Sequence, residues 1–168
     1  MIRLKRYVSE QILTQARADF LQEAVRTRLN ILIAGGTSTG KTTSPMRSCR
    51  RWPPPKTRVI VLEDTVELQC IAEDHVPLRT KPGVVSMAEL VRSTLRLRPD
   101  RIVVGEVRGS EALDLIKAWG TGHPGGIATI HAGSALGALN RLEQLIQEHA
   151  RWVHLPETGR VHYEKSCS

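Results

Sequence analysis

The sequence predicts an α/β protein with a mainly parallel β-sheet flanked by helices. Short aliphatic runs alternate with amphipathic segments of helical period along most of the chain. The first aliphatic run leads directly into a glycine-rich phosphate-binding motif, which typically joins a strand to a helix. No internal repeat or low-complexity linker interrupts this order.

Composition limits the possible functions. The 168 residues suit one domain, and 40% hydrophobic with 24% charged residues is ordinary for a globular protein. The formal charge of +7 indicates an anionic partner such as nucleotide, nucleic acid or acidic lipid, or a solvated basic surface. The three cysteines lack metal-site spacing and fit a reducing cytosol. No apolar run approaches membrane-spanning length, so we expect any membrane association to be peripheral.

The chain is expected to begin with an amphipathic helix at residues 9–28, with Ser9 as N-cap. Its apolar side chains recur at helical spacing; they are Ile12, Leu13, Ala16, Phe20, Ala24 and Val25. A first strand, Ile31 to Ala34, follows. We expect the helix to cover one edge of the sheet.

The phosphate-binding motif follows the first strand and reads GGTSTGKT. Glycines let the loop backbone converge its N–H groups on a phosphate, Lys41 adds a positive charge, and the Thr42 hydroxyl can ligate Mg²⁺. A helix beginning near Gly40 would contribute its N-terminal dipole. The expected nucleotide-binding residues are Gly35, Gly36, Thr37, Ser38, Thr39, Gly40, Lys41, Thr42 and Thr43.

Residues 44–55, SPMRSCRRWPPP, do not fit the expected helix. Pro45 falls about one turn in, where a proline removes a hydrogen bond and costs about 3 kcal/mol. These residues permit codons that, read one base earlier, encode Leu-Ala-Asn-Ala-Leu-Leu-Gln-Glu-Val-Ala-Ala-Thr. That segment has the same length and the pattern of an amphipathic helix. We therefore hypothesise that Ser44–Pro55 is a frame-shifted stretch, which the coding DNA would decide.

The rest of the chain continues the alternation. Buried strands are expected at residues 59–62, 102–104 and 127–130, each a short aliphatic run. Helices are expected at residues 86–95, 110–119 and 134–149; a capping-box pattern begins the first, and Leu113, Ile116 and Trp119 should point inward from the second. Residues 71–85 should form a loop or short edge strands, because Pro77 and Pro82-Gly83 interrupt them.

Three side chains that could take part in catalysis or ligand binding follow these strands. Glu63 ends the second strand, Glu106 the third and His131 the fourth. Because open α/β sheets bind ligands at the carboxyl ends of their strands, we expect the three near Lys41. The alternatives are solvated acidic loops and a structural histidine.

Four segments together resemble the secretion-superfamily ATPases, most closely the conjugal-transfer branch. They read GGTSTGKTT, RVIVLEDTVELQ, LRLRPDRIVVGEVRG and TGHPGGIATIHA, and cover most of residues 30–150. The resemblance implies a RecA-like P-loop NTPase core that uses ATP and Mg²⁺. It also implies a cytoplasmic motor, peripheral at the inner membrane, that works as a homo-hexamer within secretion or conjugation machinery and meets nucleic acid only indirectly.

The resemblance also implies roles for residues. Glu63 would lie near the γ-phosphate, Glu106 would be the glutamate of an atypical Walker B motif and help hold Mg²⁺, and His131 would lie near the nucleotide, with His123 a further candidate. All three are expected to be catalytic, Glu106 by activating water. The arginines Arg96, Arg98 and Arg108 could face the nucleotide or a neighbouring subunit, or be solvated.

Family members carry a domain ahead of this core, so the chain is expected to be truncated. Residues 1–29 would be a helix remaining from the linker to that domain, residues 30–150 the ATPase core and residues 151–168 a short hairpin-like tail. Ser38 also stands where the family usually has glycine. We therefore expect an ATP-hydrolysing motor subunit, with an inactive remnant or a nucleic-acid-handling RecA-like NTPase as alternatives.

Overall fold

The computed structural model describes residues 7–35, 57–66, 68, 70 and 72–153. Most of the phosphate-binding motif, Gly36 to Thr43, and the segment Ser44–Pro55 lie outside the described residues. The predictions made for them therefore remain predictions.

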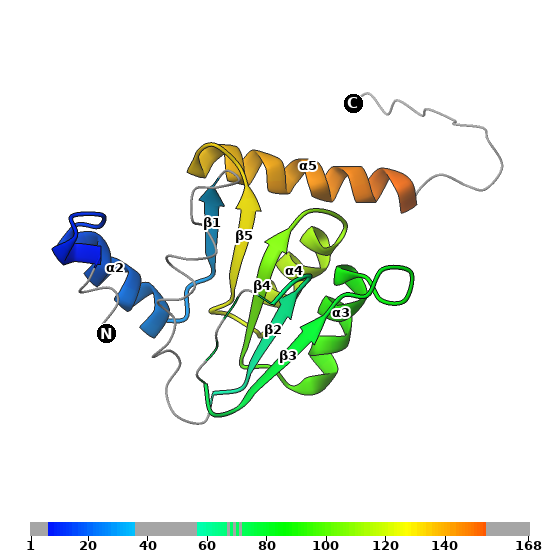
Figure 1. The fold of residues 1–168 in the computed structure, drawn as a ribbon. Coiled ribbons are helices and arrows are strands. Elements are labelled where there is room, and N and C mark those ends of the chain that lie inside the picture. The colour runs from blue at the N-terminus through cyan, green and yellow to red at the C-terminus, as the bar shows by residue number, and fades with distance from the viewer. Residues whose placement is uncertain (1–6, 36–56, 67, 69, 71, 154–168) are drawn as a thin grey trace.

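The described strands form one five-stranded sheet, and every pair of neighbouring strands is parallel. The strand order is β1-β5-β4-β2-β3 (Figure 1). Their bounds are β1 Ile31–Gly35, β2 Val59–Glu63, β3 His75–Arg79, β4 Arg101–Val107 and β5 Ile127–His131. The predicted parallel sheet is confirmed.

The strand β3 occupies one edge of the sheet and contains Pro77, opposite Val61 of β2. Proline is tolerated in an edge strand because it lacks only one backbone donor, which can face away from the neighbouring strand. The expected short edge strand in residues 71–85 is therefore present.

Helices flank the sheet (Figure 1). Their bounds are α2 Gln15–Arg26, α3 Met87–Thr94, the 3₁₀ helix η2 Leu95–Leu97, α4 Glu111–Gly120 and α5 Ala135–Val153. Side chains of α3, α4 and α5 join alternate residues of β2, β4 and β5 in a large apolar cluster on one face. A smaller cluster on the other face contains Val59, Val61, Val103 and Ile127. Among the described helices, none is long and apolar enough to cross a membrane.

The start of α3 confirms the predicted capping box. Ser86 Oγ accepts a hydrogen bond from the Glu89 amide, and the Glu89 carboxylate accepts one from the Ser86 amide. The helix then buries Met87, Leu90 and Val91. The cap fixes where the helix begins, and the buried stripe fixes which face meets the sheet.

The predicted first helix is wrong at its start and in part of its buried face. The helix α2 begins at Gln15 with Thr14 as N-cap, because Gln11 adopts a left-handed conformation (φ 57°) that interrupts helical backbone. Phe20 is 67% exposed, whereas α2 buries Ala24, as expected, and also Ala18.

Two other helices differ from the expectation. The helix α4 buries Leu115 and Trp119, whereas Ile116 is exposed and Leu113 is only half-buried. The helix α5 continues to Val153, beyond the expected end at His149.

Candidate functional site

The functional side chains expected at strand ends lie at one edge of the sheet. Glu63 is the last residue of β2 and His131 the last of β5, and Glu106 lies near the end of β4. Gly35, where the phosphate-binding motif begins, ends β1 and is paired in register with His131. Because all the strands are parallel, these four residues share the carboxyl edge of the sheet.

Glu63 is a buried carboxylate, with only 5% of the residue exposed. Its Oε1 accepts a hydrogen bond from the Leu68 amide at 2.7 Å. A Cβ atom built on Gly105 of β4 would lie 3.3 Å from Glu63 Cγ, so the absent side chain of Gly105 makes room for this glutamate. Hydrogen bonding offsets part of the cost of burying the carboxylate and fixes its orientation.

A register shift in β4 determines where Glu106 points. The pairing of β4 with β5 is irregular between Val104 and Val107, and both valines pack in the same large apolar cluster although they are three residues apart. Strict alternation would place them on opposite faces. The extra residue therefore turns Glu106 toward the face on which Glu63 lies, as β-bulges near functional sites commonly do.

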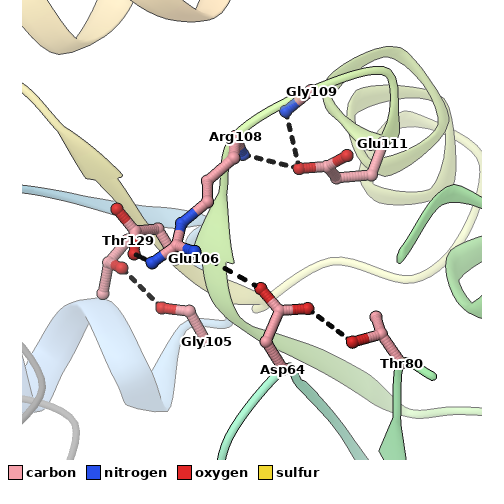
Figure 2. A network of polar contacts seen from close by, with 8 residues as sticks. All are labelled: Asp64, Thr80, Gly105, Glu106, Arg108, Gly109, Glu111 and Thr129. Carbon is pink, nitrogen blue, oxygen red and sulfur yellow. Dashed lines mark hydrogen bonds and ion pairs between the residues drawn. The ribbon is translucent and has the colours of Figure 1, made fainter. Parts of the chain in front are cut away.

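Thr129 of β5 stabilises this irregularity. Its hydroxyl donates a short hydrogen bond of 2.5 Å to the Gly105 carbonyl, and the residue is 3% exposed (Figure 2). A ladder irregularity leaves backbone groups that need other partners. The side chain of Thr129 satisfies one such group.

Arg108 links the carboxylates of two strands. Its Nη2 lies 2.5 Å from Glu106 Oε2, and its Nη1 lies 3.7 Å from Asp64 Oδ2. Asp64 follows β2 directly and also accepts a hydrogen bond from the Thr80 hydroxyl, just after β3, at 2.7 Å. Figure 2 shows the guanidinium of Arg108 between the two carboxylates. The ends of β3, β2 and β4 are thus joined by one row of polar contacts.

The turn that carries Arg108 is held by Glu111, the first residue of α4. One oxygen of Glu111 accepts hydrogen bonds from the amides of Arg108, at 2.5 Å, and Gly109, at 2.8 Å (Figure 2). The residue is 6% exposed. The buried carboxylate therefore fixes the backbone from which Arg108 reaches the strand ends.

The other candidates lie elsewhere. His123 hydrogen-bonds through Nδ1 to the Pro99 carbonyl, and both residues precede strands, at the amino edge of the sheet. Arg96 and Arg98 are exposed in or beside η2, which also precedes a strand. His131 is exposed at the carboxyl edge. The structure thus brings together Glu63, Glu106 and Arg108 but separates Arg96, Arg98 and His123 from them.

Four residues of this arrangement were not singled out from the sequence; they are Asp64, Thr80, Glu111 and Thr129. Asp64 was visible only as part of an acidic run after a strand, and Glu111 only as an acidic residue in the first turn of a helix. No signal in the sequence indicated Thr80 or Thr129.

The chain is similar in sequence to a known protein family and to several of its members. The family model described as "Type II/IV secretion system protein" matches residues 3–154. The chain is 52% identical to a probable conjugal transfer protein TrbB of Sinorhizobium fredii over 155 residues, covering 88% of this chain and 46% of the relative. It is 40% identical to the type IV secretion system protein VirB11 of Bartonella quintana, covering 77% of this chain and 37% of the relative.

Solved structures agree. The fold matches the VirB11 ATPase of Brucella suis with a TM-score of 0.74 and 35% identity, covering 89% of this chain and 45% of that one. It matches the ATPase DotB of Legionella pneumophila with a TM-score of 0.63 and 26% identity, covering 76% and 37%. These likenesses confirm the predicted RecA-like α/β core. The chain spans less than half the length of these relatives.

Proposed function

Because the chain belongs to the type II/IV secretion system protein family, we propose that it is an ATP-hydrolysing motor subunit of a conjugative-transfer or type IV secretion apparatus. The observation that supports this most directly is the carboxyl edge of the sheet. There β1 leads into the phosphate-binding motif, and Glu63 and Glu106 of β2 and β4 lie at the same edge.

In this proposal Lys41 and the backbone amides of the motif hold the triphosphate. A water oxygen attacks the γ-phosphorus, the bond from that phosphorus to the bridging oxygen breaks, and ADP and phosphate leave. Glu106 orients the water and accepts its proton, directly or through another water, and returns it to the phosphate product. Glu63, buried and hydrogen-bonded at the same edge, assists Glu106, and His131 at the end of β5 donates or accepts a hydrogen bond near the γ-phosphate.

The residues at this edge fit Mg²⁺. The ion is usually held by one or two protein oxygens together with substrate phosphates, so a dedicated cluster of ligands is not needed. The described residues contain no group of three or more metal-ligating side chains. Thr42 and Glu106 would hold the ion, Glu106 directly or through water, and the bound ion would neutralise phosphate charge.

We further propose the setting that the family suggests: a homo-hexamer in the cytoplasm, peripheral at the inner membrane, within secretion or conjugation machinery. A second candidate function is an inactive remnant, which Pro45 and the three prolines that end residues 44–55, directly after the phosphate-binding motif, favour. A third, a nucleic-acid-handling NTPase, is favoured only by the net charge of +7.

Hydrolysis of MgATP by the purified chain and by its Lys41→Ala variant tests the proposal. We expect the variant to lose at least about 99% of the rate, since the lysine charge acts on the transferred phosphoryl group. Lys117→Ala, which removes a lysine from the exposed side of α4, is the matched control and should keep the wild-type rate.

Equal rates in the wild type and Lys41→Ala would reject the motor and favour the inactive remnant. Stimulation of hydrolysis by single-stranded DNA would instead favour the nucleic-acid-handling enzyme.

A further inference from the structure

The carboxyl edge of the sheet carries a concentration of negative charge. Glu63, Asp64 and Glu106 lie at the ends of two neighbouring strands, β2 and β4, and the substrate proposed for this edge is itself a polyanion. Like charges at short range repel, and they also repel an approaching triphosphate. A function at this edge therefore needs a positive group that fixes these carboxylates.

Arg108 supplies that positive group. Among the described residues, it is the only hydrogen-bond or ion-pair partner of the Glu106 carboxylate. The same guanidinium reaches Asp64 across the strand boundary, and the Thr80 hydroxyl holds Asp64 from the other side (Figure 2). A planar guanidinium with several donors can contact two carboxylates at once, which an ammonium group does poorly.

The position of Arg108 is preset by the fold. The buried Glu111 carboxylate binds the amides of Arg108 and Gly109, so the arginine begins from a fixed backbone. Its side chain is 66% exposed, compared with 25% for Glu106. Exposed ion pairs contribute little to the free energy of unfolding, so we attribute this arrangement to positioning of the site more than to stability.

We propose that Arg108 is a positioning residue that holds Glu106 in the orientation used in hydrolysis and anchors it, through Asp64, to the end of β2. This inference rests on the proposed function. It assigns Arg108 to the carboxylates of its own chain, in place of a direct contact with the nucleotide or with a neighbouring subunit.

The test compares Arg108→Ala, Arg108→Lys and a matched control. In the control, Arg92→Ala, the lost arginine contacts Asp114 at 3.2 Å between α3 and α4 and is similarly exposed, but it lies away from the edge. We expect Arg108→Ala to lower kcat for MgATP by about tenfold or more, as loss of a correctly oriented general base does. The affinity for a non-hydrolysable ATP analogue should change much less than kcat. Arg108→Lys should recover only part of kcat, and Arg92→Ala should match the wild type.

The outcomes separate this inference from the proposed function. If Lys41→Ala is inactive and Arg108→Ala keeps the wild-type kcat, the inference fails while the motor stands. If Arg108→Ala weakens analogue binding as strongly as it lowers kcat, a direct contact with nucleotide replaces the positioning role.

If Lys41→Ala and the wild type hydrolyse ATP equally, the motor fails, and hydrogen exchange decides whether the anchor exists. Arg108→Ala should then speed amide exchange at residues 62–66 more than Arg92→Ala does. Equal exchange in the two variants would overturn the anchor as well.

Discussion

There is little room for a side chain at Gly105, where β4 passes Glu63. A Cβ atom there would lie 3.3 Å from Glu63 Cγ and 3.3 Å from the Leu62 carbonyl oxygen. Both neighbours are buried, so neither can move away cheaply. The glycine also precedes Glu106 directly and accepts the Thr129 hydrogen bond. One position therefore controls the placement of both strand-end glutamates.

We predict that Gly105→Ala destabilises the protein by about 1–3 kcal/mol, the usual cost of adding a methyl group to a packed interior. Hydrolysis of MgATP should fall at the same time, because the methyl group displaces Glu63 or shifts the bulge. Urea unfolding followed by circular dichroism measures the first effect.

Gly120→Ala is the matched control for this substitution. Among the described residues, apart from the two neighbours of Gly120 and the nearby backbone of α4, no atom lies within 4 Å of a Cβ added at Gly120. This change should therefore be neutral or stabilise the protein by up to about 1 kcal/mol. A Gly105→Ala protein as stable and active as Gly120→Ala would contradict the prediction.

At the level of elements, the cap of α3 links helix formation to pH. The pKa of Glu89 lies below its ordinary value of 4.5, because the Ser86 hydroxyl and then the Ser86 amide donate hydrogen bonds to its carboxylate. Burial opposes this shift, and the charge of Arg92 adds to it. A lowered folded-state pKa means that ionised Glu89 stabilises the folded protein above pH 4.5, and that this stability is lost as the pH falls below it.

We predict that Glu89→Gln lowers the Tm at neutral pH. The difference in Tm between this variant and the wild type should shrink as the pH falls below 4.5. Protonated Glu89 and glutamine are then both neutral acceptors at the same position. Thermal unfolding across this pH range gives the measurement.

Glu143→Gln, which removes a carboxylate from the exposed side of α5 outside any cap, controls for the loss of one negative charge. A difference for Glu89→Gln that stayed constant with pH would rule out the cap as its cause.

The elements themselves were largely predictable because their signals are local. Each of the four expected strands is a short aliphatic run, and the capping-box residues Ser86 and Glu89 indicate the start of α3. The start of α2 was not predictable, because the apolar spacing already begins at Ile12, before Gln15, and the sequence does not reveal the left-handed backbone at Gln11. Phe20 fitted that spacing but is exposed in the structure, so periodicity alone misplaced part of the buried face.

The site was predictable only in part for a related reason. Strand ends locate Glu63, Glu106 and His131 at one edge, which follows from parallel strands alone. The contact of Arg108 with Asp64 depends on β2 lying beside β4. The direction in which the Glu106 side chain points depends on the register shift in β4. Strand order and register arise from tertiary packing, which the alternation of elements does not specify.

On the scale of the whole molecule, the elements that the structure describes cover the sheet unevenly. All five residues of β2 are buried, whereas all five of β1 are only half-buried. Near β1, the helix α5 exposes Leu136 at 68% and Leu139 at 57%. Apolar side chains on a strand and on an adjacent helix normally pack beneath another element. The incomplete cover adjoins the strand that enters the phosphate-binding motif.

We predict that replacing residues 44–55 by Leu-Ala-Asn-Ala-Leu-Leu-Gln-Glu-Val-Ala-Ala-Thr, the alternative reading frame, stabilises the protein. Burying a leucine fully contributes about 1.5–3 kcal/mol, so covering part of this surface should add at least about 2 kcal/mol. For a chain of this size that corresponds to a rise in Tm of about 4–8 °C. Binding of an apolar dye should fall in parallel, because exposed leucines become covered.

The control replaces the same residues by a scrambled order of the same twelve amino acids, which keeps composition and helix propensity but removes the apolar stripe. If an amphipathic helix covers this surface, only the alternative-frame segment should stabilise the protein, and the scrambled segment should not. If both replacements raise Tm equally, removal of the prolines explains the gain and the frame-shift hypothesis loses its structural support. If neither does, this segment does not cover the exposed leucines of α5, and the frame-shift hypothesis loses its structural support as well.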